Sequence, residues 1–229
     1  IEDQIAKLRK DLEQVKEQRE TQRKQRRKNA VPVVSIVGYT NAGKSTIMNQ
    51  LLMKMGQEDS KQVFEKNMLF ATLETSVRNI ELPDNKSFLL TDTVGFVSKL
   101  PHHLVKAFRS TLEEARDSDL LLHVVDVSNE EHSFMMDVTN ETLKAVGVED
   151  IPTIYVYNKS DLANVKYPLV SGDNIWLSAK DGAGLDELIE LIKLYIFSDY
   201  ITCKMLIPYD KGNVVSYLNE VATVMTTSY

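Results

Sequence analysis

The segment Gly38–Ser45 restricts the fold of this chain more than any other part of its sequence. It reads G-Y-T-N-A-G-K-S and stands between an apolar, β-branched run, Val33–Val37, and a helical pattern, Lys44–Met55. Glycines in such a loop allow backbone conformations and close approaches that a Cβ atom would prevent. Successive backbone N–H groups and the start of the helix then face inward and bind phosphates. The pattern predicts that Lys44 reaches the β- and γ-phosphates of a nucleotide and that the Ser45 hydroxyl binds Mg²⁺.

The rest of the chain alternates between strand and helix patterns. Apolar runs predict strands, and amphipathic spacing predicts helices. The strands are expected at Phe88–Leu90, Leu120–Val127, Thr153–Tyr157 and Ile175–Leu177, and the helices at His102–Arg116, Glu130–Val146 and Leu185–Phe197. This alternation predicts an α/β fold, a mostly parallel sheet with helices on both faces. Ligands of such sheets bind at the carboxyl ends of the strands.

Charge and hydrophobic pattern divide the chain into three parts. Residues 1–30 carry ten Lys/Arg and six Asp/Glu, and their apolar side chains recur every three or four residues. This predicts a basic amphipathic linker helix, which we expect to end a preceding domain. Residues 31–198 are expected to form the nucleotide-binding domain, and residues 199–229 a small α/β segment. In that segment we expect a helix near Asn213–Val221 between strands at Ile201–Ile207 and Thr223–Tyr229.

Composition excludes other classes of protein. Hydrophobic residues make up 43% and charged residues 26% of the chain, as in globular domains. Its apolar runs are far shorter than the roughly 20 residues that span a bilayer, and the N-terminus lacks a signal-peptide pattern. A single cysteine, Cys203, cannot form an internal disulfide, which favours a reducing, cytoplasmic setting. The oligomeric state stays open, with a monomer as the expectation.

The basic arm has two interpretations. Six cations between Arg19 and Lys28 are opposed there by Glu20 alone. They could contact the phosphates of RNA, with salt-dependent affinity. They could equally form the solvated side of a linker helix.

A second phosphate motif, Asp92-Thr93-Val94-Gly95, follows the predicted strand Phe88–Leu90. A carboxylate at this position can hold Mg²⁺ directly or through water. The Gly95 N–H can turn toward a γ-phosphate, so that loss of this phosphate would release the loop. D-x-x-G is a weak motif alone, and its position 48 residues after Lys44 makes it credible.

Two further motifs concern the base. Asn158-Lys159-Ser160-Asp161 follows the predicted strand Thr153–Tyr157, and Ser178-Ala179-Lys180 follows the next one. The Asp161 carboxylate can accept hydrogen bonds from the N1–H and 2-amino groups of guanine, whereas adenine has neither donor. Asn158 and Lys159 would brace the loop and cover the base. A backbone N–H of the last motif could meet the guanine oxygen.

In this order, the four motifs resemble the G1, G3, G4 and G5 motifs of the translation-factor-related P-loop GTPases, over residues 31–198. Several longer segments are similar to the HflX family of ribosome-associated GTPases. They are Gly38–Thr46, Leu69–Glu74, Asp92–Phe96, Leu100–Val105 and Phe108–Glu114. The basic helix that runs into Val31-Pro32-Val33 fits the same family. The resemblance implies a small-GTPase-like fold and GTP and GDP as ligands. It also implies the large ribosomal subunit and its rRNA as partners.

The resemblance also assigns roles to residues. Thr72 becomes the switch threonine that completes the Mg²⁺ shell, a choice between Thr72 and Thr75 that the residues alone leave open. Lys44, Thr72 and Gly95 are then the expected catalytic groups, and Mg²⁺ is held by Ser45 and Thr72, and by Asp92 through water. The expected GTP-binding residues are Gly38, Tyr39, Thr40, Asn41, Ala42, Gly43, Lys44, Ser45, Thr46, Phe70, Ala71, Thr72, Leu73, Glu74, Asp92, Thr93, Val94, Gly95, Asn158, Lys159, Ser160, Asp161, Ser178, Ala179 and Lys180.

Two positions concern the rate of hydrolysis. Phe96 stands where many GTPases have a glutamine that orients the attacking water, so we predict slow intrinsic turnover that a partner stimulates. Asn41 either braces the loop, which we favour, or helps to hold K⁺ beside the leaving phosphate, as in K⁺-dependent GTPases. The alternative function is a nucleotide-gated binding or ribosome-assembly module of the Obg type with negligible catalysis.

Overall fold

The computed structural model describes residues 31–56, 76–93, 95, 115–148 and 150–228. The chain divides into two compact units, Ile1–Val31 and Pro32–Tyr229, and every element below belongs to the second. The linker helix predicted for residues 1–30 lies outside the described residues, as does nearly all of the helix predicted at His102–Arg116.

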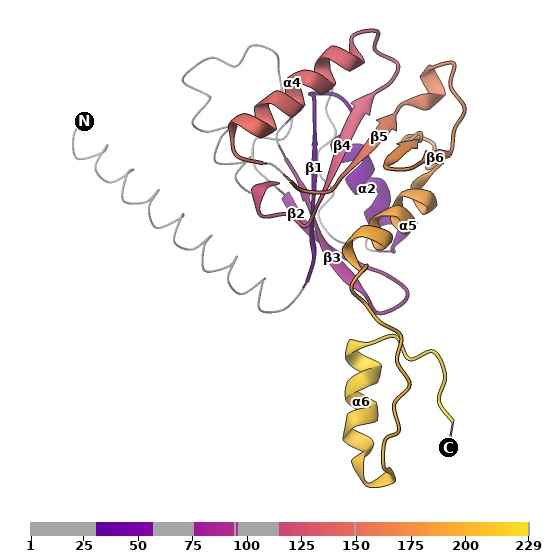
Figure 1. The fold of residues 1–229 in the computed structure, drawn as a ribbon. Coiled ribbons are helices and arrows are strands. Elements are labelled where there is room, and N and C mark those ends of the chain that lie inside the picture. The colour runs from indigo at the N-terminus through magenta and orange to yellow at the C-terminus, as the bar shows by residue number, and fades with distance from the viewer. Residues whose placement is uncertain (1–30, 57–75, 94, 96–114, 149, 229) are drawn as a thin grey trace, which may run out of the picture. The chain divides into compact units, whose positions relative to one another are not determined.

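The described strands form one seven-stranded sheet in the order β2-β3-β1-β4-β5-β7-β6. They are β1 (Val33–Gly38), β2 (Ser76–Glu81), β3 (Ser87–Asp92), β4 (Leu120–Asp126), β5 (Thr153–Asn158), β6 (Leu169–Ser171) and β7 (Asn174–Trp176). The five central strands are parallel, and β2 and β6 pair antiparallel at the two edges. The α/β fold with a mostly parallel sheet is thereby confirmed (Figure 1).

Helices cover both faces of the sheet. The covering helices are α2 (Lys44–Lys54), α4 (His132–Ala145) and α5 (Leu185–Ile196). A further helix, α6 (Gly212–Val221), lies near the C-terminus. Apolar side chains of α2 and α5 share one buried cluster with the sheet, and α4 contributes Leu143 to a second cluster with Val37 and Leu121. Burial of these faces removes apolar surface from water and fixes the helices on the sheet.

The register aligns the carboxyl ends of the central strands. Ile36 of β1 lies opposite Asp92 of β3, and Asp126 of β4 lies opposite Asn158 of β5. All predicted motif loops therefore begin at the same end of the sheet, where the carboxyl ends of the parallel strands lie. This is where this kind of fold binds its ligands.

The sequence pattern did not indicate the edge strands β2 and β6. β6 is exposed throughout, and β2 reads Ser-Val-Arg-Asn-Ile-Glu with one buried residue, Ile80. An edge strand needs few buried side chains, so its apolar pattern is weak.

The two strands predicted in residues 199–229 are wrong, whereas the helix is confirmed as α6. Residues 201–208 and 223–228 form neither helix nor strand. The side chains of Ile201 and Leu206 are 86% and 100% exposed. Apolar, β-branched runs favour strands only when a neighbouring strand accepts their backbone hydrogen bonds, and these runs have none among the described residues.

The turn between β2 and β3 contacts the end of α5. Lys193 Nζ lies 3.5 Å from Asp84 Oδ2, and Lys86 Nζ lies 3.7 Å from the same oxygen. The Lys86 ammonium also lies 5.0 Å from the ring centre of Phe197 and 5.1 Å from that of Tyr200. These cation–π and ionic contacts hold the turn to the helix.

None of the helices in the described part of the chain combines the length and the apolar character that crossing a bilayer requires.

Candidate functional site

The predicted phosphate loop connects β1 to α2, as expected. Gly38 ends β1 with φ +145°, and a Cβ there would lie 2.2 Å from the carbonyl oxygen of Val124. Gly43 precedes α2 with φ +98°, and a Cβ there would lie 2.2 Å from Asn158 Nδ2. Both positions therefore accept only glycine. The loop is pressed against β4 on one side and against the Asn158 loop on the other.

Lys44 begins α2 and is 6% exposed. Its ammonium donates hydrogen bonds to the carbonyl oxygens of Gly38 (3.1 Å) and Tyr39 (2.9 Å). Burial lowers the pKa of Lys44 from 10.5 to about 8, although the nearby Asp92 carboxylate acts in the opposite direction. The site thus holds a poorly solvated cation, which a phosphate group would stabilise.

The lowered pKa makes nucleotide binding pH-dependent. We expect the affinity for GDP to be nearly constant around pH 7 and to fall as the pH rises above about 8, because a neutral Lys44 must then recover a proton on binding. Calorimetric titrations in buffers with different ionisation enthalpies should show proton uptake at about pH 9 and little at about pH 7. The Lys44→Met variant should show no such proton uptake at about pH 9, which separates the ammonium group from titration of the ligand. Binding without proton uptake at about pH 9 would contradict this assignment.

Ser45, in the first turn of α2, meets Asp92 at the end of β3. The Ser45 hydroxyl donates a hydrogen bond of 2.7 Å to Asp92 Oδ2. Asp92 is fully buried, and the next residue, Thr93, donates to the Ile36 carbonyl at 2.7 Å. A hydroxyl beside a carboxylate is the oxygen-only ligand set that Mg²⁺ prefers. The described residues contain no group of three or more His, Cys, Asp or Glu that could hold a metal by itself.

Gly95 lies against the phosphate loop. A Cβ at this position would lie 2.8 Å from Thr40 Cα and 2.9 Å from Lys44 Nζ. The absence of a side chain leaves room beside the Lys44 ammonium, at the place where the sequence predicts the γ-phosphate. Residues Phe70–Glu74, Val94 and Phe96, which the sequence also places at the site, lie outside the described residues.

Asn158 connects three of the predicted motifs. Its Nδ2 donates to the Ala42 carbonyl at 2.9 Å, and its Oδ1 accepts from the Ala179 N–H at 3.0 Å. The side chain is 2% exposed, so both bonds are shielded from water. The phosphate loop and the two predicted base-binding loops are therefore held together by one amide.

The loop predicted to recognise the base is ordered around Lys159 and Asp161. Lys159 has a left-handed backbone with φ +62°. Asp161 lies in the short 3₁₀ helix Ser160–Leu162, and Ser160 Oγ donates to the Tyr157 carbonyl at 3.0 Å. The structure thus places the Asp161 carboxylate on the loop next to Asn158, two strands from the phosphate loop.

The sequence reading missed Asp126. This residue ends β4, and its Oδ2 accepts a hydrogen bond of 2.6 Å from Lys159 Nζ. The signal was present, because Asp126 directly follows a buried apolar run, at the strand end where ligands bind in this fold.

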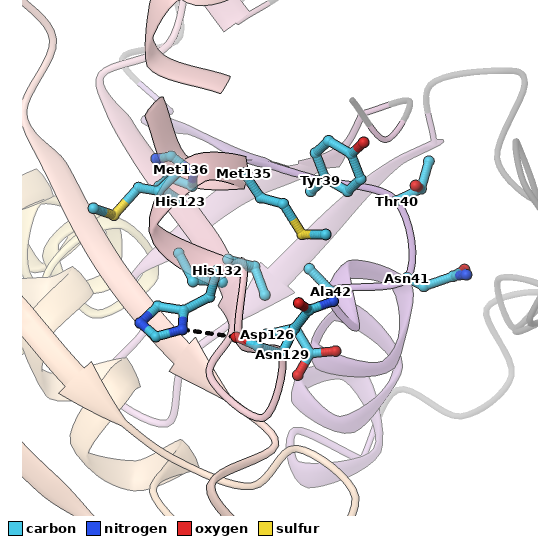
Figure 2. Close-up of a pocket in the computed structure, with 12 residues that line it drawn as sticks. Tyr39, Thr40, Asn41, Ala42, His123, Asp126, Asn129, His132, Met135 and Met136 are labelled. Atoms are coloured by element: carbon cyan, nitrogen blue, oxygen red, sulfur yellow. Dashed lines mark hydrogen bonds between the residues drawn. The ribbon is translucent and has the colours of Figure 1, made fainter. Parts of the chain in front are cut away.

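A cavity of about 210 Å³ borders the phosphate loop on the side of α4. Figure 2 shows its lining, which includes His123, Asp126, Met135 and Met136, and His132 Nδ1 lies 2.8 Å from the Asn129 carbonyl oxygen. The cavity is below the size range of typical ligand pockets, so it does not by itself accommodate a nucleotide.

His123 lies in β4 as a core residue. Its side chain is buried, and its Nδ1 has no hydrogen-bond partner among the described residues. Burial lowers its pKa from 6.5 to about 4, and the Lys44 ammonium acts in the same direction, whereas a hydrogen bond with Asn140 opposes both. His123 is therefore neutral at pH 7.

Comparisons with known proteins agree with this geometry. The family described as 50S ribosome-binding GTPase matches residues 33–159. GTPase HflX of Lacrimispora saccharolytica is 43% identical over 100% of this chain and 53% of its own length, and GTPase HflX of Caldanaerobacter subterraneus subsp. tengcongensis is 41% identical over 100% and 52%. A GTP-binding protein from Sulfolobus solfataricus, solved in complex with GDP, superposes with a TM-score of 0.58 at 28% identity, covering 74% of this chain and 53% of that one.

The chain spans about half the length of the curated relatives that it matches. The family match nevertheless covers more than half of the chain and contains the phosphate loop, Asp92–Gly95 and the start of the base-recognition loop. The identity to the HflX relatives extends over all three parts of the chain. The chain therefore belongs to the family of 50S ribosome-binding GTPases and, within it, to the HflX group.

Proposed function

We propose that this chain binds GTP and GDP with Mg²⁺, hydrolyses GTP, and acts as a cytoplasmic switch on the large ribosomal subunit. One observation carries the proposal. The buried Lys44 ammonium, the Ser45–Asp92 pair and the loop bridged by Asn158 converge on one edge of the sheet. There, the Lys44 ammonium can bind phosphate, the oxygens of Ser45 and Asp92 can bind a metal, and the Asp161 carboxylate can recognise a purine.

The residues have separate tasks in this proposal. Lys44 leaves the carbonyl groups of Gly38 and Tyr39 and binds the β- and γ-phosphates, where it stabilises the charge that develops during phosphoryl transfer. Ser45 and Thr72 would hold Mg²⁺ directly, and Asp92 would hold it through water. When bound, the metal would supply positive charge that neutralises the phosphates. The Asp161 carboxylate accepts hydrogen bonds from the N1–H and 2-amino groups of guanine.

Slow intrinsic hydrolysis is part of the proposal. Phe96 follows Gly95, and a benzyl group cannot hydrogen-bond to the attacking water. A partner that orders the site or supplies a stabilising cation would raise the rate, and an arginine supplied in this way is worth about 10³–10⁵-fold. Membership in the family of 50S ribosome-binding GTPases and the HflX relatives support the large ribosomal subunit as this partner.

Turnover of GTP by the purified chain, alone and with large ribosomal subunits, tests the proposal. We expect slow release of phosphate by the chain alone and acceleration by the subunits, with Ser45→Ala as an inactive control. Fast turnover without a partner would overturn the proposed control. Nucleotide binding with no turnover under either condition would favour the alternative, a nucleotide-gated binding module. The same assay in KCl and in NaCl would decide between the two roles of Asn41.

A further inference from the structure

Asp126 is held in a fixed orientation at the carboxyl end of β4. Its Oδ1 accepts hydrogen bonds from the N–H (3.1 Å) and the hydroxyl (2.6 Å) of Ser128, and its Oδ2 accepts the 2.6 Å bond from Lys159 Nζ. The side chain is 18% exposed. Because both oxygens are engaged, the carboxylate cannot rotate without losing a bond.

The backbone around Lys159 is fixed from both sides. Asn158 is anchored by its two side-chain bonds, and Ser160 is anchored to Tyr157. Lys159 itself has the left-handed conformation that non-glycine residues rarely adopt. The freedom that remains in this loop is therefore that of the long Lys159 side chain, and the ion pair with Asp126 removes most of it.

We propose that Asp126 is a positioning residue for guanine recognition and acts through Lys159; the inference rests on the guanine-nucleotide binding proposed above. With its ammonium held at the end of β4, the methylene stem of Lys159 is kept in place to cover one face of the purine, next to Asp161. Asp126 itself contacts no nucleotide atom. Its contribution is that the lysine is ordered before the base arrives, so binding loses less side-chain entropy.

Equilibrium binding of two ligands tests this role. GDP uses both the phosphate loop and the base loop, whereas inorganic tripolyphosphate uses the phosphate loop alone. We expect Asp126→Asn to weaken GDP binding about tenfold, the worth of one hydrogen bond to a charged group. Its affinity for tripolyphosphate should stay within about twofold of the original chain. Asp186→Asn, the same change at an exposed carboxylate of α5 that pairs with Lys54, is the matched control and should retain both affinities.

A double-mutant cycle tests the route of the effect. In a Lys159→Met background, which keeps the stem and removes the ammonium, Asp126→Asn should add less than about a twofold further loss of GDP affinity. A full tenfold loss of GDP affinity in that background would show that Asp126 acts through a group other than the Lys159 ammonium. If Asp126→Asn fails to fold, Asp126→Glu and Asp126→Gln replace it, and the glutamate variant should bind GDP the more tightly.

Failure of this inference is distinguishable from failure of the proposed function. An original chain that binds tripolyphosphate and shows no preference for GDP over ADP would overturn guanine recognition, and this role of Asp126 with it. A chain that prefers GDP but whose Asp126→Asn variant loses GDP and tripolyphosphate equally would overturn only the role of Asp126. Equal GDP affinity of variant and original chain would overturn it as well.

Discussion

Replacing Lys44 with methionine should lower the affinity for GDP and GTP about 10²–10³-fold. Truncating one partner of a buried, hydrogen-bonded charge pair costs about 2–5 kcal/mol, and each 1.4 kcal/mol corresponds to about tenfold. Methionine keeps most of the length of the side chain, so the loss measures the ammonium group. Lys54→Met is the matched control, because Lys54 ends the same helix and pairs with the exposed Asp186 at 2.9 Å.

Lys44→Met should not lower the stability of the nucleotide-free protein, although it weakens the binding of nucleotides. The pKa of Lys44 is lowered in the folded state, so the unfolded chain binds more protons between about pH 8 and pH 10.5, and stability rises with pH in that window. At pH 7 the buried charge therefore destabilises the fold. We expect the nucleotide-free variant to melt no lower than the original chain at pH 7, and a given concentration of GDP to raise its melting temperature less than that of the original chain. A variant that melts lower without nucleotide but gains as much stability from GDP as the original chain would contradict both expectations.

The second large effect concerns Asp161. Asp161→Asn should weaken GDP binding about 10²–10³-fold, because the site then offers one acceptor and one donor where guanine presents two donors. Xanthine carries a carbonyl in place of the 2-amino group, so the asparagine amide fits its edge better. The preference should shift from GDP toward xanthosine diphosphate.

Affinities for GDP, xanthosine diphosphate and ADP measure this change. Asp186→Asn is a matched control, since this exposed residue of α5 pairs only with Lys54 in the described contacts. The control should keep the original preference, and tripolyphosphate should bind all three proteins alike. An Asp161→Asn variant that still prefers GDP would show that another group recognises guanine.

The sequence predicted the parts of the fold in which burial and local pattern agree. β4 is buried along nearly its whole length, and the run Leu120–Val125 shows this without ambiguity. α5 buries Leu185, Leu188, Ile189 and Ile192, the four residues that its spacing placed on one face. A buried helix or strand needs apolar residues at the period of its secondary structure, so the sequence alone predicts it.

The sequence did not correctly predict segments whose conformation depends on residues far away in the chain. The runs near Ile201 and Thr223 have strand-forming composition, yet their conformation depends on whether another strand lies beside them. The four motif loops were identified because phosphate and guanine chemistry dictates their residue types. Asp126 was missed because a single carboxylate has no motif, and its partner Lys159 lies 33 residues away.

The anchored turn between β2 and β3 has a mechanical consequence. β3 begins at this turn and ends at Asp92, beside the predicted nucleotide. A slide of β3 by one residue along β1 would separate Lys86 from both aromatic rings and Asp84 from Lys193. We therefore expect the hairpin of β2 and β3 to keep its register on β1 when GTP is exchanged for GDP.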